Sequence, residues 1–322
     1  MNYWETIIAQ CQRRIERIRS NPDPTKLRIN ELIYQSEMEN AKDWLEIWKR
    51  GDRICGTMDQ AAIFSALGFR NVGYLGAGNR SNVMKKDYFD ILRRNGLPDQ
   101  TCDMTILPLA MCIEGDLPFP HVVSVWNHAC DRETDMLFTA MATYSGCPQF
   151  KLDLPLSTDY EAVRYCAAQL GELIEWVEWK FPGVKMNWER LERDNAIADE
   201  QVKLKRLQFE LRKKVPSPIS GQDVFRLGGG GRLDDKDPLK WLRLQTEEIA
   251  NRAAKGIGSV VGEEKLRVAW LATGPFGSGI FDMLHKKGVS VPWFQHGFTC
   301  DEFGFHDWAD FGYYGDTNEY KH

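Results

Sequence analysis

Two segments at the start of the chain place hydrophobic residues at every third or fourth position. In residues 3–20 these positions are Trp4, Ile7, Ile8, Cys11, Ile15 and Ile18. The spacing predicts an amphipathic helix, because one helical turn holds 3.6 residues. SNPDPTK interrupts the pattern, and a second helix is predicted from about Lys26 to Trp48. We therefore expect residues 1–49 to form an N-terminal helical extension.

From about residue 50 the pattern changes to short apolar strands that alternate with helices. RICG, the start of VVSVWNHACD (Val122–Asp131) and FKLDLP, which ends at Pro155, have the composition of strands. AAIFSALGF and RETDMLFTAMATYSG between them have the composition of helices. Since this alternation is typical of parallel sheets, residues 50–228 are predicted to form an α/β domain.

Two long helices follow within the same domain. The first covers residues 157–181, with Thr158 and Glu161 as a capping box and apolar residues at three- and four-residue steps. The second runs from its cap Asn187 to about Lys213, where PSPISG ends it because proline cannot continue a helix. The glycine run Gly228–Arg232 then predicts a joint between domains.

A second α/β domain is predicted over residues 234–322. A helix over Pro238–Lys255 precedes two strands, LRVAWLAT and VSVPWFQ, with a helix between them. This single unit leaves strand surface such as Val289, Val291 and Trp293 uncovered, although parallel sheets are covered on both faces. The second domain is therefore apparently incomplete: either the chain is part of a longer one, or something else completes the domain. The predicted fold is α/β, with two parallel-sheet domains of the flavodoxin- or Rossmann-like kind.

Composition narrows the function classes. The 322 residues carry a formal net charge of −5, with 43% hydrophobic and 27% charged residues. This mild acidity argues against general nucleic-acid binding, which depends on basic surfaces. No apolar run is long enough for a membrane span, and the charged N-terminus lacks the apolar core of a signal peptide. We predict a cytoplasmic protein with neither nucleic-acid nor membrane partners.

The eight cysteines contain no C-x-x-C pair, which excludes zinc-ribbon and thioredoxin-like sites. Cys130 follows the strand VVSVW, and Cys102 precedes the apolar stretch MTILPLAMCI, a possible helix. Parallel sheets bind ligands beyond the carboxyl ends of their strands, and thiolates suit zinc or iron–sulfur clusters. Cys102 and Cys130 are therefore candidate metal ligands, although two buried thiols would have the same pattern.

Two further loops have candidate chemistry. Thr57 and Asp59 follow the strand RICG, where they either bind a ligand or cap the helix that starts near Gln60. The loop GPFGSG lies between a strand and a helix, but its glycines do not have the spacing of a dinucleotide-binding fingerprint. Nicotinamide binding is therefore disfavoured.

Taken in order, these features resemble the 2-hydroxyacyl-CoA dehydratase and class I benzoyl-CoA reductase family over about residues 50–300. The resemblance is carried by LPDQTCDMTILPLAM, VVSVWNHACD, LERDNAIADE, PSPISG and RVAWLATGPFGSGIFDMLHKKGVSVPWF. It implies an iron–sulfur cluster, of the [4Fe–4S] or a related type, held between two α/β domains by three cysteines. Cys102 and Cys130 match the first two ligands. The third lies past the end of this chain, and Cys300 comes too early to match it.

The resemblance also implies a reaction. An ATP-dependent activator protein delivers one electron to the cluster, and the electron passes to the carbonyl of a CoA thioester. The resulting ketyl radical expels the 2-hydroxyl group, with Thr57 and Asp59 in the loop near the substrate. The alternatives are a ring-reducing subunit of the benzoyl-CoA reductase type and a cluster-free structural or regulatory subunit. The resemblance implies a homologous second subunit, or a second copy of the chain, as partner.

Overall fold

A computed structural model describes residues 1–57, 60–97, 102–127, 131–157, 159–225, 237–271 and 279–295. The chain divides into two compact units. The first contains residues 1–9 and 41–195, and the second contains residues 10–40 and 196–322. Parallel strands and long helices follow a helical N-terminal segment, so the predicted α/β fold class is confirmed. The predicted joint at Gly228–Arg232 lies outside the described residues.

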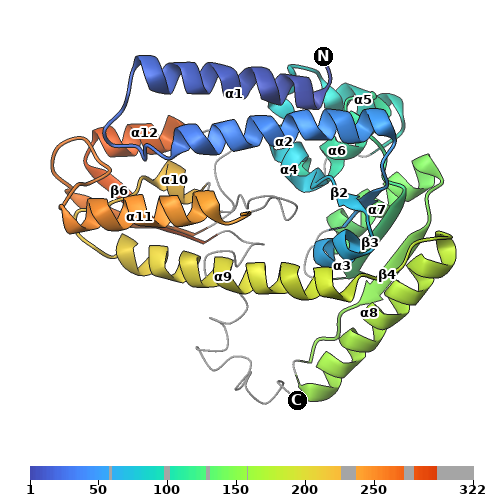
Figure 1. Cartoon of the computed structure of the whole chain (residues 1–322). Coiled ribbons are helices and arrows are strands. Elements are labelled where there is room, and N and C mark those ends of the chain that lie inside the picture. The colour runs from blue at the N-terminus through green and yellow to red at the C-terminus, as the bar shows by residue number, and fades with distance from the viewer. Residues whose placement is uncertain are drawn as a thin grey trace. The chain divides into compact units, whose positions relative to one another are not determined.

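The N-terminal helices α1 (Tyr3–Ser20) and α2 (Asn30–Arg50) run antiparallel to each other (Figure 1). Trp4 stacks on Trp44 with ring centroids 5.5 Å apart, and Arg19 pairs with Glu31 at 2.7 Å near the other end. α1 has the predicted bounds. α2 begins four residues later than expected, because a turn that Asp23 caps through the backbone N–H of Thr25 precedes it.

The first unit contains a parallel sheet with the strand order β2-β1-β3-β4. β1 (Ile54–Gly56), β3 (Val122–Asn127) and β4 (Gln149–Asp153) are the three predicted strands. β2 (Arg70–Asn71) was not predicted, because two residues are too few to show an alternating pattern. The helices before β4 are α3 (Ala61–Ala66), α4 (Tyr74–Asn79), α5 (Tyr88–Arg94), α6 (Asp103–Ile113) and α7 (Asp131–Ser145), with a 3-10 turn at Ser81–Met84.

One core cluster of this unit lies between the sheet and helix α8 (Tyr160–Lys180). Leu173 and Val177 of α8 are fully buried against Val122 and Leu152 of the strands. The apolar residues of the first turns of α8 are not all covered, since Tyr160 is 50% exposed. A helix of 21 residues extends ~32 Å whereas the five residues of β4 extend only ~17 Å, so the sheet cannot cover the whole helix.

Local capping explains where the two long helices begin. Asp159 caps α8 by accepting a hydrogen bond from the backbone N–H of Ala162 at 2.9 Å, whereas the predicted cap Thr158 lies outside the described residues. Asn187 caps α9 (Trp188–Arg212) by accepting from the backbone N–H of Arg190 at 2.9 Å, as predicted. Both contacts satisfy amide groups that a helix start leaves without partners.

The second unit contains a parallel pair of strands, β5 (Leu266–Leu271) and β6 (Val289–Gln295). Helices α10 (Gly221–Phe225), α11 (Lys240–Ala254) and α12 (Gly279–Lys286) belong to the same unit. The prediction that Val291 is exposed is wrong, because this side chain is fully buried. It belongs to a core cluster that includes Phe281 of α12 and Leu27 and Ile29, which precede α2. The N-terminal segment thus covers apolar strand surface.

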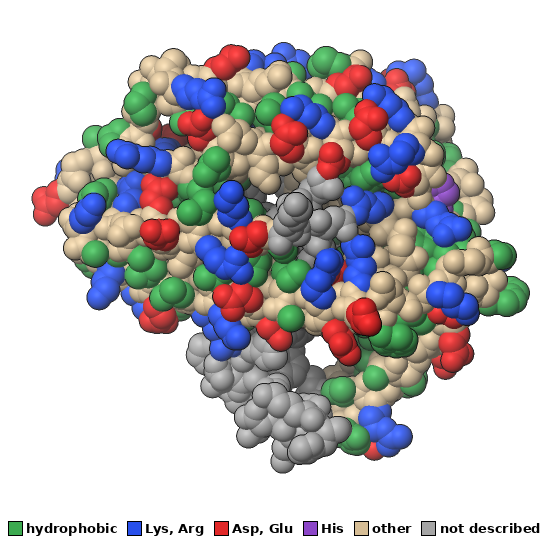
Figure 2. Space-filling model, in the orientation of Figure 1, with side chains coloured by type: hydrophobic (Ala, Val, Ile, Leu, Met, Phe, Trp, Pro, Cys, Tyr) green, Lys and Arg blue, Asp and Glu red, His purple; other side chains and the backbone are tan. Residues whose placement is uncertain are grey.

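Charged side chains of both signs are interspersed over the face drawn in Figure 2. Exposed pairs such as Arg243 with Asp237 at 2.6 Å each contribute little to stability in water. None of the helices in the described ranges is long and apolar enough to cross a lipid bilayer.

Candidate functional site

Thr57 lies directly after β1, at the carboxyl edge of the first sheet. Its side chain is buried, and its hydroxyl oxygen accepts a hydrogen bond from the backbone N–H of Gln60 at 3.3 Å. Because α3 begins at Ala61, this bond satisfies an amide group at the helix start. Gln60 is the N-cap residue of α3, so Thr57 binds the backbone directly before this helix.

The Gln60 side chain connects this loop to β3. Its hydrogen-bond partners are all satisfied when the amide nitrogen donates to the hydroxyl oxygen of Thr57 and to the backbone carbonyl of Ser124 at 3.2 Å. In this orientation its Oε1 accepts from Trp126 Nε1 at 2.5 Å. The oxygen of Thr57 then accepts two hydrogen bonds, so its own O–H group is left to donate elsewhere.

The carboxyl ends of β3 and β4 are joined by side chains that were not predicted as part of the site. Asn127 Nδ2 donates to Asp153 Oδ1 at 2.5 Å, and Asn127 Oδ1 accepts from the backbone N–H of Leu154 at 2.5 Å. Gln169 of α8 pairs with the backbone of Asp153 through both amide atoms. These bonds hold the edge of the sheet in place. In the sequence, the signal for this contact is an Asn and an Asp at the ends of two consecutive strands.

Cys102 precedes α6 and occupies its N-cap position. The residue is exposed, its backbone is extended, and its side chain makes no capping hydrogen bond. Its carbonyl oxygen accepts from the hydroxyl group of Thr105 at 2.8 Å. A soft thiol at the positive end of a helix suits an anionic iron–sulfur cluster in chemical type.

Asp59 and Cys130 lie outside the described residues, as does Cys300. Within the described ranges, no group of three or more His, Cys, Asp or Glu side chains is arranged to hold a metal ion. The pairing of Cys102 with Cys130 therefore stays a prediction.

The remaining described cysteines differ from Cys102 in burial. Burial raises the pKa of the Cys55 and Cys112 thiols well above the usual range, and the Cys112 thiol donates to the Pro118 carbonyl at 3.4 Å. Burial also raises the pKa values of Cys147 and Cys166. Since metal ligation requires the thiolate, these environments disfavour ligation.

The comparison with known families identifies the protein class. The sequence model of the 2-hydroxyglutaryl-CoA dehydratase D-component family matches residues 61–299, about three quarters of the chain. The chain therefore belongs to this family, and the predicted resemblance is confirmed. No curated protein matches it. Membership indicates a dehydratase-type enzyme subunit that works with a partner component on a CoA thioester. Cys102 and Cys130 lie inside the matched range, and Thr57 and Asp59 precede it.

Proposed function

We propose that this chain is the iron–sulfur subunit of a 2-hydroxyacyl-CoA dehydratase, with Cys102 and Cys130 as two of the cluster ligands. The family match over residues 61–299 is the observation that carries the proposal, because both cysteines lie within it. The cluster would be of the [4Fe–4S] or a related type. Such clusters persist in a reducing compartment, so we place the protein in the cytoplasm.

The course of the chain supports a common location for the two thiols. α6 ends in a tight turn, in which the backbone N–H of Asp116 donates to the Met111 carbonyl at 2.8 Å. The chain then enters β3 at its amino end, where the backbone N–H of His121 donates to the Ile54 carbonyl at 2.7 Å. A helix that leads into a parallel strand through such a turn runs antiparallel to that strand. The start of α6, and with it Cys102, then lies toward the carboxyl edge of the sheet. β3 ends at this edge, and Cys130 follows the end of β3 in the sequence.

The substrate would lie at the same edge of the sheet. Thr57 has a hydroxyl oxygen that already accepts two hydrogen bonds from Gln60, so its O–H group is the donor that remains. We assign this O–H to the carbonyl oxygen of the thioester. Asp59 lies two residues further along the same loop, and we assign it to substrate binding as well.

When bound, the cluster would supply one electron to the thioester carbonyl, after reduction by an ATP-dependent activator protein. Loss of the 2-hydroxyl group and of a proton from the neighbouring carbon amounts to loss of water. Because this elimination is redox-neutral, the electron is returned at the end of each turnover. The chain's own task is to orient the thioester and exclude competing reactions. The proposed partners are a homologous second subunit, or a second copy of the chain, and the activator.

Two other functions use the same fold. A ring-reducing subunit of the benzoyl-CoA reductase type would need the same thiols, but the matching family is described as a dehydratase component, which favours dehydration. A cluster-free structural or regulatory subunit would need neither thiol. Iron content separates this last function from the first two.

The test is anaerobic purification followed by iron and acid-labile sulfide analysis. Cys102→Ala and Cys130→Ala should each abolish the brown chromophore, because every lost ligand opens the cluster to solvent. Cys166→Ala is the matched control, since its half-buried thiol is best explained by packing, and it should retain the colour. Full iron occupancy in Cys130→Ala would overturn the ligand assignment. Absence of iron from the wild-type protein would favour the cluster-free subunit.

A further inference from the structure

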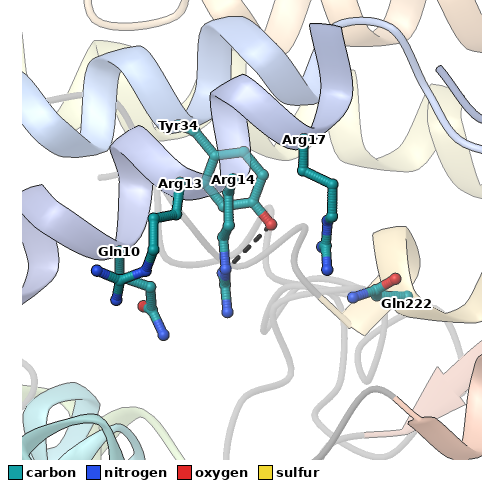
Figure 3. A pocket seen from close by; sticks show the side chains of 6 residues that line it. All are labelled: Gln10, Arg13, Arg14, Arg17, Tyr34 and Gln222. Atoms are coloured by element: carbon teal, nitrogen blue, oxygen red, sulfur yellow. Dashed lines mark hydrogen bonds between the residues drawn. The ribbon is translucent and has the colours of Figure 1, made fainter. Parts of the chain in front are cut away.

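One face of α1 carries a cluster of arginines. Residues at steps of three, four and seven lie on one face of a helix, and Gln10, Arg13, Arg14 and Arg17 have this spacing. They line a pocket of about 420 Å³ together with Tyr34 of α2 and Gln222 of α10 (Figure 3). All six residues belong to the second unit.

Neighbouring side chains hold part of this pocket in place. Arg14 Nη1 donates to the hydroxyl oxygen of Tyr34 at 3.2 Å, and its guanidinium carbon lies 5.1 Å from the centroid of the Tyr34 ring. Gln222 Oε1 accepts from Lys26 Nζ at 3.1 Å, and Lys26 in turn pairs with Asp282 at 2.8 Å. The amide nitrogen of Gln222 is therefore turned toward the arginines (Figure 3).

Two of the three arginines that line the pocket, Arg13 and Arg17, have no acidic partner among the described residues. Arg19 on the same helix, in contrast, pairs with Glu31 at 2.7 Å. Like charges one turn apart on a helix repel each other. A bound anion removes this repulsion, and the planar guanidinium groups suit phosphate because they donate two parallel hydrogen bonds.

We propose that this pocket binds the phosphate groups at the nucleotide end of the CoA thioester. The identity of the ligand rests on the proposed function. CoA carries a pyrophosphate and a separate 3′-phosphate, which match an arrangement of three arginines better than a single phosphate does. The amide of Gln222 adds a neutral donor beside the charged ones. The pocket is concave and has the volume of a small-molecule site, which favours CoA over an acidic protein surface or a nucleic acid.

The test is calorimetric titration of CoA into the full chain at low salt, under anaerobic conditions. Arg13→Gln and Arg17→Gln should each weaken CoA binding about tenfold, because each removes a charge-assisted contact. Arg17→Lys keeps the charge but loses the paired donors, and its affinity should lie between wild type and Arg17→Gln. Arg19→Gln is the matched control on the same helix and should leave the affinity unchanged.

Three further titrations identify the source of the phosphate. 3′-Dephospho-CoA and ADP should bind more weakly than CoA, and inorganic phosphate should bind weakest. Inorganic phosphate that binds as tightly as CoA would overturn the proposal, as would equal CoA affinities in wild type and Arg17→Gln. An equal loss of affinity in Arg19→Gln would reveal a general charge effect and overturn it too. Circular dichroism of each variant confirms that it is folded.

Iron analysis of the same samples separates this proposal from the function on which it rests. Arginine-dependent CoA binding in iron-free protein would support the proposed CoA pocket and contradict the proposed iron–sulfur subunit. A full cluster with CoA binding that is independent of Arg13 and Arg17 would overturn the pocket alone.

Discussion

The hydroxyl oxygen of Thr57 accepts a hydrogen bond from the backbone N–H of Gln60 at 3.3 Å and a second one from the side-chain amide of the same residue. One residue thus fixes the rotation of the Thr57 side chain from two directions. The remaining O–H group has a defined direction, as expected of a group that positions a substrate carbonyl.

Replacement of Thr57 separates substrate binding from the contact with the start of α3. Thr57→Val keeps the shape of the side chain but removes the O–H, and it should lower kcat/KM for the thioester about tenfold or more. It also removes the acceptor of the Gln60 backbone N–H and of one side-chain N–H of Gln60, which should cost about 1–2 kcal/mol in the free energy of unfolding. Thr57→Ser should restore both quantities. Lost stability with unchanged kcat/KM would show that Thr57 only stabilises the start of α3.

Asp194 on α9 should be a main determinant of stability in the first unit. Its fully buried carboxylate accepts from Ser65 Oγ at 3.1 Å and pairs with Arg193 at 3.0 Å. Asp194→Ala should lower the free energy of unfolding by about 1–2 kcal/mol, because it removes the buried acceptor of partly buried donors. Asp194→Asn keeps an acceptor oxygen and should cost less. Urea unfolding measures both, and equal losses would contradict this account.

His285 should make the second unit less stable in mild acid. Burial, together with the nearby charge of Lys26, lowers the pKa of His285 from 6.5 to about 4, although Asp223, Asp282 and Asp23 oppose the shift. Its Nε2 accepts from the backbone N–H of Gly221 at 3.3 Å, which requires an unprotonated nitrogen.

The direction in which stability changes with pH follows from proton binding in the folded and unfolded chain. Between pH 6.5 and about 4 the unfolded chain holds a proton on His285 that the folded chain lacks, so stability is present above this window and lost as the pH falls through it. The loss should be roughly 2–3 kcal/mol in urea unfolding. His285→Gln cannot titrate, and its unfolding free energy should vary less over the same window. Identical pH profiles would exclude His285 as the cause.

Elements with strong periodicity could be predicted from the sequence alone. The bounds of α1 were predicted to the residue, because its apolar side chains repeat over several turns. β2 and the six-residue helix α4 were missed, since segments this short show no repeat. The exposure of Val291 was predicted wrongly because Leu27 and Ile29, which share its core cluster, are more than 250 residues away in the chain.

The candidate sites also differ in how far the sequence alone predicts them. Cys102 and Thr57 could be found because a residue that follows a strand or starts a helix can be located from the pattern. The arginine pocket was not predicted, because the spacing of Arg13, Arg14 and Arg17 is also that of an ordinary solvated helix face. The pocket differs from such a face because Arg14 contacts Tyr34 and because Gln222, from a distant segment, lines the same pocket.

Cys102 should be the most reactive of the described cysteines in metal-free protein. Alkylation requires an accessible thiolate; Cys102 is exposed, whereas Cys55 and Cys112 are buried and burial raises their pKa values. Iodoacetamide should label Cys102 at least about tenfold faster than Cys55 or Cys112, as measured by peptide mass mapping. In denaturant the rates should converge, which controls for intrinsic differences between the peptides. Cluster reconstitution should protect Cys102, because an iron-bound thiolate is not free to react, and Cys55 should label as slowly as before. If Cys102 labels equally fast with and without the cluster, it is an exposed thiol and not a ligand.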